Sequence, residues 1–179
     1  MKTPLKLHLG CGNIRLDKWV NVDWTENPYT DLVDDVTQLN KFEENSVDEI
    51  YACHILEHFG LDHNIEQPRC IDVLQRWNKI LKPNGVLYVS VPNLLSLMQG
   101  LKDNCNNMSN TFDILQCCFG GQNYKGNTHY SGFTEPYLKH LLERTGYCNI
   151  STFEPFVRDT STFNLHGINV SINLKAYKI

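Results

Sequence analysis

The sequence predicts an α/β protein built on a mainly parallel sheet that helices cover. Strand-like apolar segments alternate with helical or turn-like segments, which is typical of parallel strands joined by crossovers. Residues 168–177 instead alternate strictly between apolar and polar side chains, which favours an antiparallel strand with one face in water. With 179 residues, 41% of them hydrophobic, the chain suits one core. We therefore expect a single domain over residues 1–179.

The first half of the chain contains the strands expected to be parallel. Runs of β-favouring residues place them at 5–9, 19–22, 31–33, 47–52 and 86–91. A helix is expected from about Arg69 to Lys82, because its apolar residues recur at spacings of three and four and form one stripe. Pro83 cannot continue the helical hydrogen bonds, and Asn84-Gly85 favours a tight turn. The helix should therefore end there.

The second half contains one further helix and two strands. The helix is expected to begin near Thr134, whose side chain can cap it, and to end at Gly146. Strands follow at 150–157 and 168–177. Between Pro92 and Phe133 the periodicity weakens, and residues 120–128 are rich in Gly and Asn. We expect a long irregular insertion there, and such segments are usually either functional loops or disordered.

Residues 7–24 are the most informative about function. A short strand leads into the turn Gly10-Cys11-Gly12, and the next strand ends in Asp23. Glycines let the backbone approach a ligand closely, and a carboxylate at the tip of the neighbouring strand can accept hydrogen bonds from both ribose hydroxyls. The pattern predicts a nucleoside-binding site.

Composition argues against several other classes of protein. The net charge of -4, with Lys and Arg scattered, indicates neither a nucleic-acid partner nor an anionic membrane surface. No apolar run approaches the ~20 residues of a membrane span, so we expect a cytoplasmic protein with no membrane partner. The seven cysteines include no Cys-x-x-Cys pair, so they indicate neither a disulfide framework nor a zinc finger. The oligomeric state is left open.

Five stretches in order resemble the class I S-adenosylmethionine-dependent methyltransferases, in particular small members with a shortened first loop. The stretches are residues 7–13, 20–24, 47–59, 73–93 and 129–147. The resemblance implies a Rossmann-like sheet of seven strands, six parallel and the last antiparallel, with helices on both faces. It also implies an enzyme that uses S-adenosyl-L-methionine.

The resemblance assigns individual residues to this cofactor. It implies that Asp23 holds the ribose hydroxyls, that Trp24 packs on the adenine, and that Asp35 and Val36 meet the adenine edge. The residues implied to line the rest of the cofactor are Leu9, Gly10, Cys11, Gly12, Asn13, Cys53 and His54.

The chain departs from this family directly after the glycine turn. Only residues 13–19 separate Gly12 from Val20, so the helix that normally follows is expected to be a turn. A helix N-terminus is a ready anion site, and its loss leaves the cofactor's carboxylate to Arg15 or to the backbone of Asn13.

The methyl acceptor is expected to be a small molecule or a sugar-type metabolite. Methyl transfer from a sulfonium is an in-line displacement, so alignment and water exclusion matter most. A hydroxyl acceptor benefits from a base, and His54 and His129 are the candidate catalytic residues, since histidine titrates near neutral pH. We expect residues 94–133 to form a substrate-side lid that brings Tyr124, His129 and Tyr130 to the acceptor. The other histidines expected at the surface are His63, His140 and His166.

Three alternatives remain beside this reading. A nicotinamide-type site needs a third glycine in register and an acid about 20 residues onward, whereas Asp23 follows Gly10 by 13 residues. Residues 54–58 spell His-x-x-Glu-His, a zinc-protease pattern, but no third ligand is evident and no metal is expected. The same fold without activity, as an S-adenosylmethionine-binding or interaction module, is the alternative function.

Overall fold

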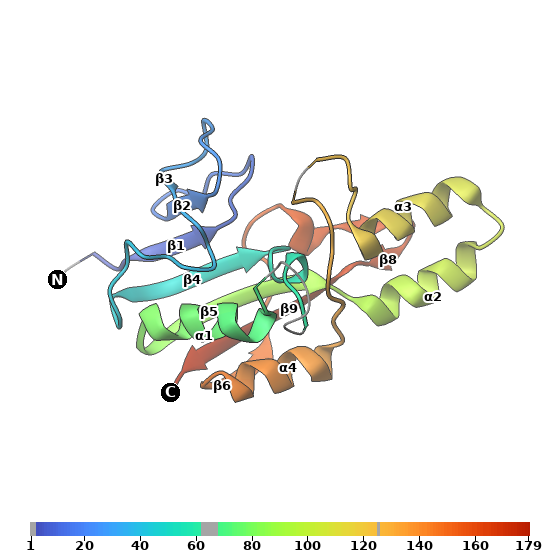
Figure 1. Ribbon diagram of the computed structural model, residues 1–179. Helices are drawn as coiled ribbons and strands as arrows, with labels where there is room; N and C mark the ends of the chain where they lie inside the picture. Colours follow the sequence, from blue (N-terminus) through green and yellow to red (C-terminus); the bar gives the residue numbers. More distant parts are fainter. Residues whose placement is uncertain (1–2, 62–67, 125) are drawn as a thin grey trace.

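The computed structural model describes residues 3–61, 68–124 and 126–179, and a seven-stranded sheet forms its centre (Figure 1). The strand order is β3-β2-β1-β4-β5-β9-β6, and β9 alone runs antiparallel to its neighbours. This arrangement confirms the predicted Rossmann-like sheet with an antiparallel last strand. The strands are β1 (Lys6–Leu9), β2 (Val20–Asp23), β3 (Leu32–Val33), β4 (Val47–Cys53), β5 (Leu81–Pro92), β6 (Tyr147–Thr152) and β9 (Ser171–Lys178).

One face of the sheet packs against α1 (Cys70–Ile80) and α4 (Glu135–Arg144), which lie on the same side of it (Figure 1). Leu7, Ile50 and Val89 point to this side and join one core with Trp77 and Leu142, all 0% exposed. Helix α1 ends at Ile80, two residues before the predicted end, and the turn expected at Asn84-Gly85 lies within β5 instead. The ends of α4 agree with the prediction. Thr134 accepts the hydrogen bond of the Tyr137 amide, and Gly146 at φ +86° lets the chain turn into β6.

The opposite face differs from the expected helix layer. Its side chains include His8 and Tyr51, because successive residues of a strand point to opposite faces. Trp19 and Phe156 cover them: the Tyr51 ring lies 5.0 Å from that of Phe156 and 6.4 Å from that of Trp19. Residues 10–19 and 24–31, which join β1 to β2 and β2 to β3, form turns. These connections are too short for crossover helices, so aromatic side chains cover the sheet there instead.

The segment after β5 is ordered, which corrects the expectation of an irregular insertion. It forms α2 (Leu94–Asn104) and α3 (Met108–Phe119), a helical hairpin that extends away from the sheet (Figure 1). Its buried residues Leu97 and Ile114 pack with Val170 beside the short strands β7 (Asn164–Leu165) and β8 (Ile168–Asn169). Asn93 and Asn107 cap the two helices. Each helix buries only a narrow stripe, so its periodicity is weak in the sequence.

Two further differences concern the end of the chain. β6 begins at Tyr147 rather than at residue 150, and residues 153–157 leave the sheet to cover its aromatic face. Two short 3₁₀ helices, η1 (Leu56–His58) and η2 (Thr160–Thr162), follow β4 and that covering segment. No helix among the described residues has the length and hydrophobicity to cross a membrane.

A hydrogen bond from the buried Tyr51 hydroxyl stabilises the aromatic face of the sheet, and a first prediction follows from it. Tyr51 is 0% exposed, and its hydroxyl donates to Asp159 Oδ2 at 2.5 Å. Tyr51→Phe should lower the free energy of unfolding by about 1–3 kcal/mol, because it leaves a carboxylate oxygen without its donor. Urea denaturation measures this change. Tyr88→Phe on the same face is the matched control, since the Tyr88 hydroxyl makes no hydrogen bond within the described residues; equal losses in both variants would contradict the assignment.

Candidate active site

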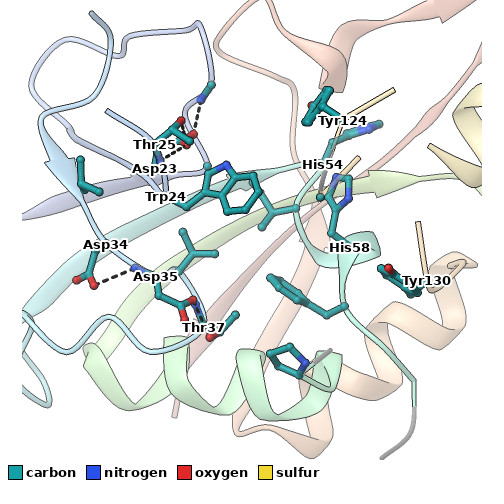
Figure 2. A pocket seen from close by; sticks show the side chains of 18 residues that line it. Asp23, Trp24, Thr25, Asp34, Asp35, Thr37, His54, His58, Tyr124 and Tyr130 are labelled. Carbon is teal, nitrogen blue, oxygen red and sulfur yellow. Dashed lines mark hydrogen bonds between the residues drawn. The ribbon is translucent and has the colours of Figure 1, made fainter. Parts of the chain in front are cut away.

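A cavity of about 860 Å³ opens at the carboxyl ends of β1, β2, β3 and β4 (Figure 2). Ligands of open α/β sheets bind at this edge, because the loops that follow parallel strands converge there. Residues from six parts of the chain line the cavity. They are Gly10 and Gly12 after β1, Asp23 to Thr25 after β2, Val33 to Thr37 at β3, His54, Ile55, His58 and Phe59 after β4, and Pro68, Tyr124, Gly126 and Tyr130.

The glycine turn forms one wall of the cavity. Gly10 and Gly12 have φ angles of +59° and +53°, which favour glycine. A Cβ on Gly10 would lie 1.8 Å from Ile55 Cδ1, whereas one on Gly12 would meet nothing within 4 Å. Gly10 therefore allows the loop after β4 to pack closely, and Gly12 leaves open space for a ligand.

Asp23 lies at the end of β2, as predicted, and its carboxylate is held rigidly. Oδ2 accepts the Gly12 amide at 2.9 Å, and Oδ1 accepts the amide and hydroxyl of Thr25 at 3.1 and 2.9 Å. The side chain is nearly buried yet borders the cavity. Three hydrogen bonds leave part of the acceptor capacity of a carboxylate, about four sites, for a ligand hydroxyl.

Trp24 and Asp35 both line the part of the cavity beside Asp23 (Figure 2). Trp24 is 57% exposed, which is unusual for so large an apolar ring and leaves its face free to stack on a ligand. Asp35 Oδ1 accepts the amide and hydroxyl of Thr37 at 2.8 and 2.7 Å. The neighbouring Asp34 Oδ2 is buried without a hydrogen-bond partner in the described residues. An acidic, aromatic-walled half of the cavity results.

The tip of the 120–130 loop closes over this half. A Cβ on Gly126 would lie 2.9 Å from Trp24 Cη2, so the loop backbone touches the indole. At its other end the loop is anchored to η1, because the amides of Tyr130 and Ser131 donate to the Glu57 carbonyl at 2.8 and 3.2 Å. Tyr124 and Tyr130 thereby enter the cavity wall.

Several residues assigned from the sequence do not reach the wall. Leu9 and Cys11 are buried behind the glycine turn, and Asn13 is exposed outside the cavity. Cys53 Sγ lies 3.3 Å from Thr160 Oγ1, and burial raises the pKa of this thiol to about 12. Arg15, a candidate for the cofactor's carboxylate, pairs instead with Asp31 at 2.6 Å. These residues shape or support the loops rather than line the cavity.

His54, His58 and His129 gather around Glu57 beside the cavity. His54 has a φ of +54°, a conformation that non-glycine residues adopt at few sites and often at functional ones. Its Nδ1 lies 3.4 Å from Glu57 Oε1, and His129 Nε2 lies 4.0 Å from the same oxygen. The rings of His58 and His129 pack edge to face at 4.9 Å. Three imidazole rings and one carboxyl group, all of them able to exchange protons or bind metals, thus lie close together.

Burial dominates the electrostatics of this group. Glu57 is 0% exposed, and neither carboxylate oxygen has a hydrogen-bond partner in the described residues. Desolvation raises the pKa of Glu57 to about 8. Desolvation lowers the pKa of His54 to about 4, with His129 as the next cause, and it lowers the pKa of His129 to about 4, with His58 as the next cause. All charged forms are disfavoured here.

The sequence reasoning missed part of this site. It did not assign Thr25, Ile55, Phe59 or Gly126 to the cavity, because nothing in their spacing marks them. Glu57 and His58 were visible in the His-x-x-Glu-His pattern, but their spatial neighbour His129 is more than 70 residues away in the chain. His140 and His166 are exposed as expected, and His63 lies outside the described residues.

Comparison with known proteins agrees with this geometry. The family model described as a methyltransferase domain matches residues 7–89, and no curated protein matches the chain. A SAM-dependent methyltransferase from Archaeoglobus fulgidus is 17% identical with a TM-score of 0.60, over 98% of this chain and 86% of that one. A SAM-dependent methyltransferase from Methanosarcina mazei is 16% identical with a TM-score of 0.59, over 100% and 94%.

A third similar structure carries ligands. It is the 1,6-didemethyltoxoflavin-N1-methyltransferase of Burkholderia thailandensis, with bound 1,6-didemethyltoxoflavin and S-adenosylhomocysteine. It is 16% identical with a TM-score of 0.55, over 98% of this chain and 71% of that one. At such identities the solved structures establish the shared fold, while the family model covers the glycine turn, Asp23 and η1.

The residues present fit the cofactor of this family. Gly12 leaves an open cradle, Asp23 presents an oriented carboxylate, and Trp24 offers an exposed ring within one cavity. Residues 7–89 match the methyltransferase-domain family model, and the chain as a whole has the fold of S-adenosylmethionine-dependent methyltransferases.

Proposed function

We propose that this chain transfers a methyl group from S-adenosylmethionine to a small-molecule or sugar-type acceptor. The observation that carries the proposal is that one cavity joins two chemically different halves (Figure 2). Asp23, Trp24 and Asp35 form the acidic, aromatic half, and His54, Tyr124 and Tyr130 border the other. A cofactor in the first half would place its reactive end toward the second half.

In the cofactor half we assign the ribose hydroxyls to Asp23 and the adenine to Trp24, Asp35 and Val36. We assign the methionine part to the backbone of the glycine turn, where a Cβ on Gly12 would meet nothing within 4 Å. Four residues keep only an indirect role, the support of the surrounding loops, because none of them lines the cavity: Leu9, Cys11, Asn13 and Cys53. Bound S-adenosylmethionine supplies an electrophilic methyl group on a sulfonium.

In the acceptor half we assign contacts with the substrate to Tyr124, Tyr130 and His54. Residues 94–133 act as the lid, because their loop touches Trp24 at Gly126 and η1 at Tyr130. Closure aligns the acceptor with the methyl group and excludes water, which is most of what an in-line displacement requires. His129 does not line the cavity, so we assign it an indirect role in the acceptor half, through its contact with Glu57.

Asp23 provides the test of the cofactor half. Isothermal titration should show binding of S-adenosylmethionine and S-adenosylhomocysteine to the wild type. Asp23→Ala should weaken binding at least tenfold, because hydrogen bonds to a charged group contribute about 1.5–3 kcal/mol. The affinity of Asp23→Asn, which keeps one acceptor oxygen for the Gly12 amide, should lie between those of the wild type and Asp23→Ala.

Asp17→Ala, an exposed substitution away from the cavity, serves as the control for this titration. Unchanged affinity in folded Asp23→Ala would refute the ribose assignment. A wild type that binds the cofactor but methylates no acceptor would favour the alternative of a non-catalytic binding module.

Gly126 provides the test of the lid. Gly126→Val places a branched side chain against Trp24 at a φ of +96°, so it should hold the loop away from the indole. Transfer of tritiated methyl to a panel of sugars and other hydroxylated small molecules should fall at least tenfold, a larger factor than the accompanying loss of affinity for S-adenosylhomocysteine.

Lys102→Ala, in α2 and exposed, is the matched control within the same segment. Equal losses of turnover and cofactor affinity in Gly126→Val would count against a lid that acts on the acceptor.

A further inference from the structure

We propose that Glu57, His58 and His129 bind a divalent transition-metal ion, with His54 beside it. The three residues each offer a ligand atom, and these atoms lie within 4.8 Å of one another. Two imidazoles and one carboxylate form a donor set that suits Zn²⁺ and related ions. The metal site is argued from geometry alone, whereas its role toward the acceptor, given below, rests on the proposed function.

The first support is the environment of Glu57. Its carboxyl group is 0% exposed, and both oxygens lack hydrogen-bond partners in the described residues. A buried carboxyl group without donors is costly, and buried acidic groups are usually paired, hydrogen-bonded or bound to a metal. Among the described residues, the basic side chains within 4.0 Å of Glu57 Oε1 are His54 and His129. A cation between them would supply the missing partner.

The second support is the protonation of the His58 and His129 rings: hydrogen bonds show which nitrogen of each ring carries the proton. His58 Nδ1 lies 3.0 Å from the Thr128 carbonyl, and His129 Nδ1 lies 3.1 Å from the Cys117 carbonyl. A carbonyl only accepts, so Nδ1 carries the proton in both rings and Nε2 keeps a lone pair. Metal-binding histidines are typically oriented in this way by a backbone carbonyl on the opposite ring nitrogen.

Hydrogen bonds also place the proton of His54, but here Nε2 carries it and Nδ1 keeps the lone pair. The Ser171 hydroxyl donates to the Thr160 carbonyl at 2.8 Å, so its oxygen accepts from His54 Nε2 at 2.8 Å. The lone pair of His54 Nδ1 then faces Glu57 Oε1 at 3.4 Å. Imidazole lone pairs and a carboxylate therefore converge on one small volume. They repel one another unless a positive charge lies among them.

The competing explanation is a proton on Glu57. A neutral Glu57 would donate to one acceptor, for which His54 Nδ1 is nearest, and would satisfy that pair alone. A metal ion accepts electron density from Glu57, His58 and His129 together. The two explanations predict different outcomes for added metal and for Glu57→Gln, which mimics the neutral acid.

The place of the site suggests its use. His54 and His58 also line the cavity on the acceptor side, so a metal at this cluster borders the space assigned to the acceptor. Three protein ligands leave coordination positions for substrate oxygen, and metal coordination makes a hydroxyl more acidic. The acceptor hydroxyl would lose its proton to solvent, its oxygen would bond to the methyl carbon, and the C–S electron pair would remain on sulfur. We therefore infer that the acceptor is methylated on oxygen.

The test titrates chelator-treated protein with ZnCl₂, CoCl₂ and MnCl₂ under reducing conditions. We expect one ion per chain for at least one metal, with cobalt(II) giving a visible spectrum without thiolate bands. Glu57→Gln and His129→Ala should each weaken binding at least tenfold. His140→Ala, an exposed histidine of α4 outside the cluster, should bind like the wild type.

Two results would overturn the metal site. One is a folded wild type, judged by circular dichroism, that binds none of the three ions stoichiometrically. The other is equal affinity in wild type, Glu57→Gln and His129→Ala. S-adenosylhomocysteine binding is titrated on the same samples. Cofactor binding without metal binding refutes only this inference, whereas loss of cofactor binding in the wild type refutes the proposed function.

Discussion

The hydrogen bond from the Gly12 amide to Asp23 Oδ2, at 2.9 Å, joins the two strands on which the cavity depends. The Cys11 amide also donates to the Val22 carbonyl at 3.1 Å, so the turn continues the pairing of β1 and β2. No helix follows β1 within residues 10–19, so hydrogen bonds such as that from the Leu16 amide to Asn21 Oδ1 also hold this connection against the sheet. The carboxylate to which we assign the ribose hydroxyls therefore also fixes the glycine turn.

The aromatic face and the acceptor half of the cavity are connected through the end of the chain. Tyr51 holds Asp159, and the following residue, Thr160, accepts the Ser171 hydroxyl that orients His54. The segment that replaces the missing helices on one face of the sheet thus sets the ring of a cavity residue. The short connections after β1 and β2 leave one sheet face to the C-terminal segment, and that segment also orients the His54 ring through Thr160 and Ser171.

The 94–133 segment performs two tasks with one chain. Its helices α2 and α3 pack on β7 and β8, away from the sheet, and give the loop a rigid base. The loop then crosses to Trp24 at Gly126 and returns to the Glu57 carbonyl at Tyr130, which carries His129 beside His58. His129 joins the cluster around Glu57 only through this loop, so the proposed lid and the proposed metal site would be coupled.

Periodicity, caps and turn residues act over a few neighbouring positions, so the sheet, the two covering helices, the glycine turn and the place of Asp23 could be predicted from the sequence. The sequence also predicted Trp24, Asp35, Tyr124 and Tyr130 as site residues, and all four line the cavity. Three features could be seen only in the folded chain: aromatic side chains replace helices on one face, residues 94–133 contain a helical hairpin, and His129 lies beside Glu57 and His58. These outcomes depend on contacts between distant segments, whose energy arises from burial and has no local signature in the chain.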